Sequence, residues 1–145
     1  MARVDIALPE HFCFSTELCI YQSHINEAAH LDNAQLMTLV SEARQRFFSH
    51  LGYTQTSVEG VGIVITDAAV RYLSEAFHGE TLVFRLAAQD FNKYGCDLVY
   101  AVSERDSGRE VARVKTGLVF FDYEARKVRP VPDAFRTRLD SLQAA

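Results

Sequence analysis

Proline is scarce in this 145-residue sequence, which has only Pro9, Pro130 and Pro132, all near the ends. Because proline interrupts helices and inner strands, residues 10–129 are free to form one continuous sheet with a helix. Long apolar runs are missing too, since no stretch approaches the ~18 consecutive apolar residues that a membrane-spanning helix requires. The first residues also lack the apolar core of a secretory signal, so we expect no association with membranes.

Cysteine is equally scarce, with Cys13, Cys19 and Cys96 as an odd set of three. Cys13 and Cys19 are six positions apart on one expected strand, a separation of roughly 20 Å at ~3.3 Å per residue. That distance is too long for a disulfide bond. We therefore expect three free thiols in a protein of the reducing cytoplasm.

Positive charge is not in excess, because the 15 Lys and Arg residues are outnumbered by 19 Asp and Glu residues, which gives a net charge of −4. A nucleic-acid-binding surface needs clustered Lys and Arg, so this class of partner is disfavoured. The apolar share of 48% and the charged share of 23% are typical of a folded globular chain. We expect one domain over residues 1–145, which is long enough to bury a core without disulfide bonds or a bound metal.

A long amphipathic helix is predicted from about Asn33 to Leu51. Asp32 is a candidate N-cap, and Gln35 stands where a capping-box partner belongs. Gly52 suits the left-handed position that follows a helix, and Phe48 widens the apolar surface to a second side. We therefore expect other structure to wrap this helix. Its main apolar face consists of Leu36, Leu39, Val40, Ala43, Phe47 and Leu51.

The rest of the chain is predicted to form strands, one before the helix and four after it. The segments Asn92–Gly95 and Asp106–Gly108 carry turn residues, so the last three strands are expected to form an antiparallel meander. One helix cannot cover both faces of a five-stranded sheet, and we therefore expect a homodimer or homotetramer. The expected strands span about residues 12–22, 61–74, 82–88, 98–102 and 111–123.

This order of elements resembles that of hotdog-fold proteins, in which a curved antiparallel sheet wraps a central helix. The segment Asn26–Ala34, followed by Ser41–Arg44 and Leu51–Gly52, resembles the 4-hydroxybenzoyl-CoA thioesterase-like branch of the hotdog-fold thioesterase superfamily. That branch typically reads Asp-x-x-Gly-His-Val-Asn-Asn before a helix that often carries Glu-Ala-Arg. Val70–Leu82 and Asn92–Leu98 look like its strand–turn–strand segment and its hairpin.

The resemblance implies an α+β hotdog fold with a five-stranded antiparallel sheet around one helix. It also implies an acyl-CoA or acyl-carrier thioesterase, which hydrolyses a thioester to an acid and a free thiol.

The resemblance further implies where the reacting groups lie. The branch holds the thioester carbonyl on a backbone N–H at the helix start, which falls near Asn33 here. Its catalytic Asp corresponds to Asn26, and an amide cannot act as a carboxylate base or nucleophile. Its Gly before the His corresponds to Ala29, which restricts the backbone. We interpret Asn26 as a residue that orients the thioester or a water by hydrogen bonding.

The identity of the carboxylate base is left open between two residues. Glu27 adjoins Asn26, whereas Glu42 lies on the helix, where other hotdog branches carry a carboxylate. Glu42 also has Arg46 four residues further on, so a plain exposed ion pair is its alternative interpretation. His30 either contacts the substrate or holds carbonyl groups of the loop.

No bound cofactor or metal is expected beyond the CoA part of the substrate. Lys93 is a candidate for binding a CoA phosphate and Tyr94 for stacking on the adenine, although both also suit an ordinary exposed turn. The possible metal ligands of the loop match no standard zinc spacing. These ligands are His24, Glu27, His30 and Asp32.

Two other functions fit part of the pattern. A non-catalytic hotdog protein that binds an acyl or thioester ligand is favoured by Asn26, which lacks the charge of the usual Asp. A hotdog dehydratase or hydratase would need a His and a carboxylate on the helix, whereas His30 precedes it.

Overall fold

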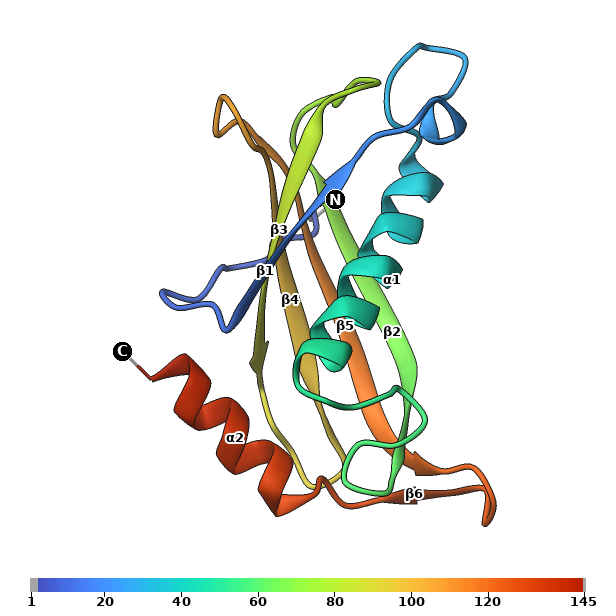
Figure 1. Cartoon of the computed structure of the whole chain (residues 1–145), viewed down its shortest axis with the longest axis vertical. Coiled ribbons are helices and arrows are strands. Elements are labelled where there is room, and N and C mark those ends of the chain that lie inside the picture. The colour runs from blue at the N-terminus through green and yellow to red at the C-terminus, as the bar shows by residue number, and fades with distance from the viewer. Residues whose placement is uncertain (1–2, 145) are drawn as a thin grey trace.

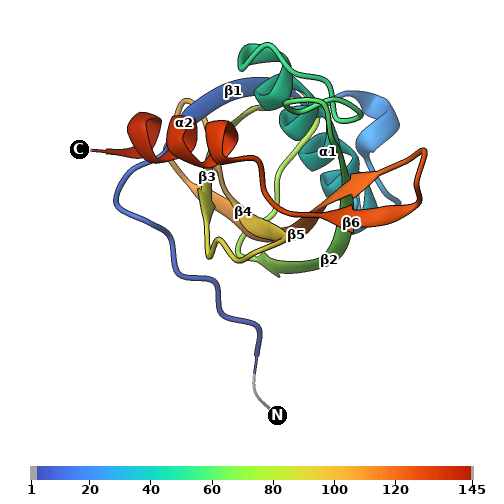
Figure 2. The same ribbon diagram turned by 90° about the horizontal axis from the view of Figure 1, so that it is seen from below.

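The computed structural model describes residues 3–144, and a curved antiparallel sheet surrounds a long helix in it, as the sequence predicts. Figure 1 shows the helix lying along the concave side of the sheet, and Figure 2 shows β1 and β2 on opposite sides of it. The strands are ordered β1-β3-β4-β5-β2. The main elements are β1 (Phe14–Cys19), α1 (Asn33–His50), β2 (Gly62–Tyr72), β3 (Thr81–Gln89), β4 (Gly95–Glu104) and β5 (Glu110–Asp122).

The register of the sheet brings large core side chains of neighbouring strands side by side. Leu86 of β3 pairs with Tyr100 of β4, which pairs with Val114 of β5, and all three side chains are fully buried. They belong to the same core as Phe47 of α1. Each large apolar side chain contributes about 1.5–3 kcal/mol when it is buried. A shift of one residue would turn this row away from the core, so its burial favours the observed register.

The start of α1 is capped by the side chain of Asp32, as predicted. Its Oδ2 accepts hydrogen bonds from the N–H groups of Ala34 at 2.9 Å and Gln35 at 3.3 Å. The predicted capping-box role of Gln35 is wrong, because the N–H of Asp32 instead donates to the carbonyl of His24 at 2.9 Å. At the other end, Gly52 takes the expected left-handed conformation with φ of 84°.

Two elements at the C-terminal end were not predicted: the short strand β6 (Lys127–Arg129), which pairs with β5, and the helix α2 (Asp133–Gln143). The ring of Phe135 in α2 stacks on Phe48 of α1, with 6.3 Å between the centroids. Phe135 also packs edge-on against Phe120 of β5 at 5.3 Å. The second apolar side of α1 is thus covered by α2.

The first strand is shorter than predicted at both ends, and Gln22, its last predicted residue, instead begins a 3-10 turn, Gln22–His24. All three cysteines are free thiols, as expected. Burial raises the pKa of Cys13 to about 11 and that of Cys96 to about 12, which keeps both thiols protonated at neutral pH. Among residues 3–144, no helix is long and apolar enough to cross a membrane.

Candidate functional site

A pocket of about 440 Å³ lies where the loop before α1, the first turn of α1 and the end of β2 meet. This is the upper right of Figure 1, where the blue loop meets the start of the helix. Asn26, His30 and Asn33 line the pocket, so three of the five predicted reacting residues come together. Tyr72 and Glu75 reach it from the β2 side.

Asn26 closes the tight turn that carries His30. Its Oδ1 accepts from the N–H groups of Ala28 at 3.0 Å and His30 at 3.4 Å, while its own N–H donates to the carbonyl of His30 at 3.0 Å. An Asn side chain that bonds the backbone two residues on is a common turn former. Its Nδ2 carries two N–H donors, and the residue lines the pocket.

The turn requires one residue in the left-handed region, and Ala29 fills that position with φ of 65°. A side chain at such a φ costs about 1–2 kcal/mol relative to ordinary backbone. The sequence prediction that Ala29 restricts this loop therefore agrees with the strain seen here.

The backbone N–H of Asn33 is the donor at the helix start. As the first residue of α1 it has no acceptor within the helix, and in the described part of the chain no other group accepts from it. Asp32 engages the next two N–H groups and leaves that of Asn33 available beside the pocket. The positive end of the helix dipole lies at the same place.

Tyr72 fixes the peptide group that follows this donor. Its hydroxyl donates to the carbonyl of Asn33 at 2.9 Å. Burial, together with the nearby charge of Asp32, raises the pKa of Tyr72, so the hydroxyl keeps its proton and remains a donor at neutral pH.

His30 holds a loop carbonyl, as one of its two interpretations predicts, and it also lines the pocket. Its Nδ1 lies 3.1 Å from the carbonyl oxygen of Leu31. A carbonyl only accepts, so Nδ1 carries a proton. The opposite nitrogen, Nε2, lies 3.9 Å from Oε1 of Glu75.

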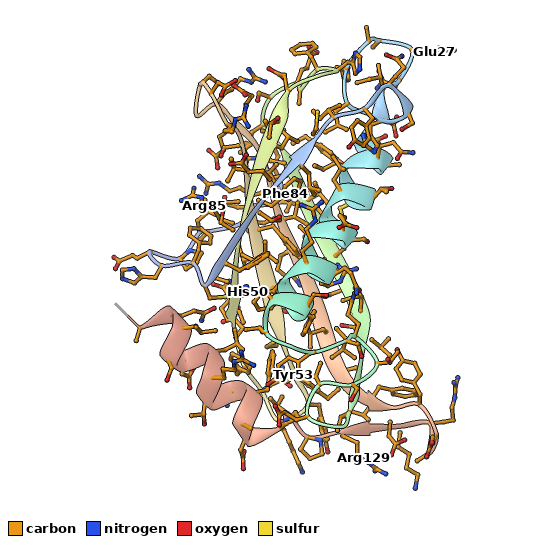
Figure 3. The ribbon with its side chains drawn as sticks, in the orientation of Figure 1. Glu27, His50, Tyr53, Phe84, Arg85 and Arg129 are labelled. Atoms are coloured by element: carbon orange, nitrogen blue, oxygen red, sulfur yellow. The ribbon has the colours of Figure 1, made fainter. Side chains whose placement is uncertain are left out.

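The two predicted carboxylate bases lie elsewhere. Glu27 is exposed and does not line the pocket, and Figure 3 shows it at the outer edge of the loop. Glu42 lines a separate hollow beside β1 and pairs with Arg46, with 2.8 Å between Oε2 and Nε. Arg46 also donates to the carbonyl of Glu17 at 2.9 Å. The side chain of Glu42 thus forms the ion pair that was its alternative interpretation.

Lys93 and Tyr94 lie in the turn between β3 and β4, at the opposite end of the sheet from the pocket in Figure 1. Both side chains are exposed, and Nζ of Lys93 lies 5.3 Å from the centre of the Tyr94 ring. Within one chain these residues therefore do not share the pocket with Asn26 and His30. Across residues 3–144, no three His, Cys, Asp or Glu side chains group as a cation site.

Sequence reasoning assigned no role to Tyr72 or Glu75. Both lie in Val70–Leu82, the segment that resembles the strand–turn–strand of the thioesterase branch. They come to the pocket through a contact in space, in which the N–H of Leu31 donates to the carbonyl of Ala76 at 2.7 Å. That bond brings together two segments more than 40 residues apart in the sequence.

A family model described as the thioesterase-like superfamily matches residues 21–139. The chain belongs to this superfamily. No curated protein matches the sequence.

Solved structures of similar shape agree with this family. A 1,4-dihydroxy-2-naphthoyl-CoA thioesterase from Synechocystis is 21% identical, with a TM-score of 0.79 over 89% of this chain and 96% of that one. A thioesterase from Thermus thermophilus, complexed with coenzyme A and Zn, is 19% identical, with a TM-score of 0.79 over 92% and 97%. A Staphylococcus aureus protein in complex with CoA is 16% identical, with a TM-score of 0.80 over 98% and 91%. The fold is the hotdog fold of these proteins.

Proposed function

We propose that this protein is an acyl-CoA or acyl-carrier thioesterase, which hydrolyses a thioester to a carboxylic acid and a free thiol in the pocket at the start of α1. The observation that carries the proposal is the unbonded N–H of Asn33, which lies at the positive end of a capped helix beside a pocket. The membership of the thioesterase-like superfamily supports the same reaction.

Thioester hydrolysis passes through a tetrahedral intermediate whose carbonyl oxygen becomes an anion. A donor that is fixed before the reaction stabilises this oxygen without reorganisation, and one such donor contributes about 100- to 1000-fold in rate. The N–H of Asn33 suits this role, since Asp32 and Tyr72 hold the peptide groups around it. Asn26 would orient the thioester or a water through its Nδ2.

A CoA thioester as substrate is supported by three of the similar structures. One is named as a CoA thioesterase, and two contain CoA. Lys93 and Tyr94 lie far from the pocket within one chain, so they would reach a bound CoA only from a second copy. The proposed homodimer or homotetramer is consistent with this, because β2 is an edge strand of the sheet.

A second candidate function is non-catalytic binding of an acyl or thioester ligand. The observation in its favour is Asn26, which stands where the resembling branch carries a carboxylate and whose Oδ1 is engaged by Ala28 and His30. Such a protein would bind the thioester in the same pocket and leave it intact.

Loss of thioester absorbance separates the two functions. Purified protein would be assayed with a panel from acetyl-CoA to palmitoyl-CoA plus benzoyl-CoA derivatives, and with acyl-carrier protein as a further substrate. Turnover far above the uncatalysed rate is the expected result. Saturable binding of one thioester without turnover of any would instead establish the binding protein.

A further inference from the structure

Glu75 and His30 both line the pocket, and their side chains approach each other. The two atoms that approach are Oε1 of Glu75 and Nε2 of His30, 3.9 Å apart. The approach is fixed by the backbone, since the N–H of Leu31 donates to the carbonyl of Ala76 at 2.7 Å and both residues adjoin the pair. The side chain of Glu75 is 64% exposed, so its carboxylate is in contact with solvent.

The hydrogen bond of His30 to the loop determines which nitrogen can act as a base. Because Nδ1 donates to the carbonyl of Leu31, the lone pair of the neutral ring is on Nε2. That nitrogen lies toward Glu75 and beside the pocket. A ring with its tautomer fixed and a carboxylate nearby is suited to accept a proton from water.

The other carboxylates near the pocket are less suited to this role. Asp32 lines the pocket, but its Oδ2 caps α1 by accepting from two N–H groups. Glu42 is bonded to Arg46 on another face of the helix, and Glu27 does not line the pocket. Glu75 is therefore the carboxylate of this pocket that has only His30 as a partner within residues 3–144.

We propose that Glu75 supplies, from the turn between β2 and β3, the carboxylate that position 26 lacks, and that it acts with His30 on the attacking water. This inference rests on the proposed thioesterase function. A gap of 3.9 Å lets one water lie about 2.8 Å from both Nε2 and Oε1. Glu75 positions this water and stabilises the charge that forms on His30.

The reaction balances with these groups alone. Nε2 of His30 takes a proton from the water as the water oxygen bonds to the thioester carbon, and the carbonyl electron pair moves to oxygen. The N–H of Asn33 holds that oxygen. The carbonyl then re-forms, the carbon–sulfur bond breaks, and the proton on His30 passes to the leaving thiolate. Water and thioester thus give a carboxylic acid and a thiol.

Steady-state kinetics of Glu75→Gln test this role, because the substitution keeps the size of the side chain and removes its charge. We expect kcat to fall about 10- to 100-fold while KM stays within about threefold. The substitution removes the charge that positions the attacking water and leaves the binding of the acyl group unchanged. Glu124→Gln is the matched control at an exposed carboxylate of the turn between β5 and β6. It should retain the kcat of the wild type.

A second variant distinguishes a role in the reaction from a role in folding. Asn26→Asp placed in the Glu75→Gln protein restores a carboxylate on the other wall of the pocket, and its oxygen can still accept from Ala28 and His30. We expect kcat to recover at least about tenfold. A merely structural defect would not recover in this way.

The outcomes separate the inference from the function on which it rests. A wild type that turns over no thioester would overturn both. Turnover by the wild type with an unchanged kcat in Glu75→Gln would overturn the role of Glu75 and leave the thioesterase function intact. A lowered kcat that Asn26→Asp does not restore would also overturn it.

Discussion

Individual residues of this chain show where local structure is strained and where charge is held in place. Ala29 occupies the left-handed region with φ of 65° because the turn closed by Asn26 requires it. Glu104 at the end of β4 is buried, and its carboxylate accepts from the N–H groups of Asp106 at 3.0 Å and Ser107 at 2.9 Å. We expect each of these features to affect the free energy of unfolding.

Replacing Ala29 by Gly should raise the free energy of unfolding by about 1 kcal/mol, because glycine adopts this backbone without a side-chain clash. Ala28→Gly is the matched control one residue earlier, at a position without positive φ. It should lower the same free energy, since it only adds freedom to the unfolded chain. Urea unfolding measures both, and equal shifts in the two variants would contradict the assignment of strain to position 29.

The stability of the wild type should fall on acidification because of Glu104. Its bonds to Asp106 and Ser107 lower the pKa from 4.5 to about 2, so the contribution is complete above pH 4.5 and is lost as pH falls toward 2. Glu104→Gln should be less stable than the wild type near neutral pH, and the difference should vanish toward pH 2. Urea unfolding over a pH series measures this, and a difference independent of pH would refute it.

Among the elements, the helix α2 is the main one that the sequence does not predict. Its last residue, Gln143, makes two bonds to the backbone of Ala88 in β3: Oε1 accepts from the N–H at 2.6 Å, and Nε2 donates to the carbonyl at 2.8 Å. The pairing of β1 with β3 ends at Phe14 and Leu86. The amide of Gln143 therefore continues the edge of the sheet beyond β1.

Gln143→Ala should destabilise the protein by about 1–3 kcal/mol, because it leaves two buried backbone groups of Ala88 unpaired. Hydrogen exchange at the Ala88 amide should become faster in the variant. Gln22→Ala, at an exposed position of the 3-10 turn, is the control. Unchanged exchange at Ala88 would show that α2 does not protect this edge.

The elements that could be predicted are those with a strong period. Apolar residues at helical spacing indicated α1, and alternation indicated the strands of the meander. The helix α2 carried a weaker signal, with Phe135 and Leu139 four residues apart after Pro132, and it was missed because it is short. The capping by Gln35 failed for another reason: Asp32 donates to His24 across the loop, a contact that no local pattern specifies.

For the molecule as a whole, the site joins a local motif to a distant segment. Asn26, His30 and Asn33 lie within eight residues, so the sequence was sufficient to group them. Tyr72 and Glu75 join them only because the loop before α1 pairs with the turn after β2. Glu42 has the residue type and helix position of a base, yet the direction of its side chain depends on packing against β1.

The central claim is that the N–H of Asn33 stabilises the reacting oxygen in this pocket. Asn33→Pro removes this donor alone, because proline is favoured at the first position of a helix, where its missing N–H breaks no helical bond. Asp32 has φ of −68° and ψ of 142°, the backbone that a residue before proline prefers. The thermal stability of the variant should therefore remain close to that of the wild type.

The deciding measurement is kcat for thioester hydrolysis by Asn33→Pro beside Asn33→Ala, which keeps the backbone N–H. The proline variant should be at least about 100-fold slower than the alanine variant. Equal rates in the two folded variants would contradict the claim, because the reacting oxygen would then be held by another group.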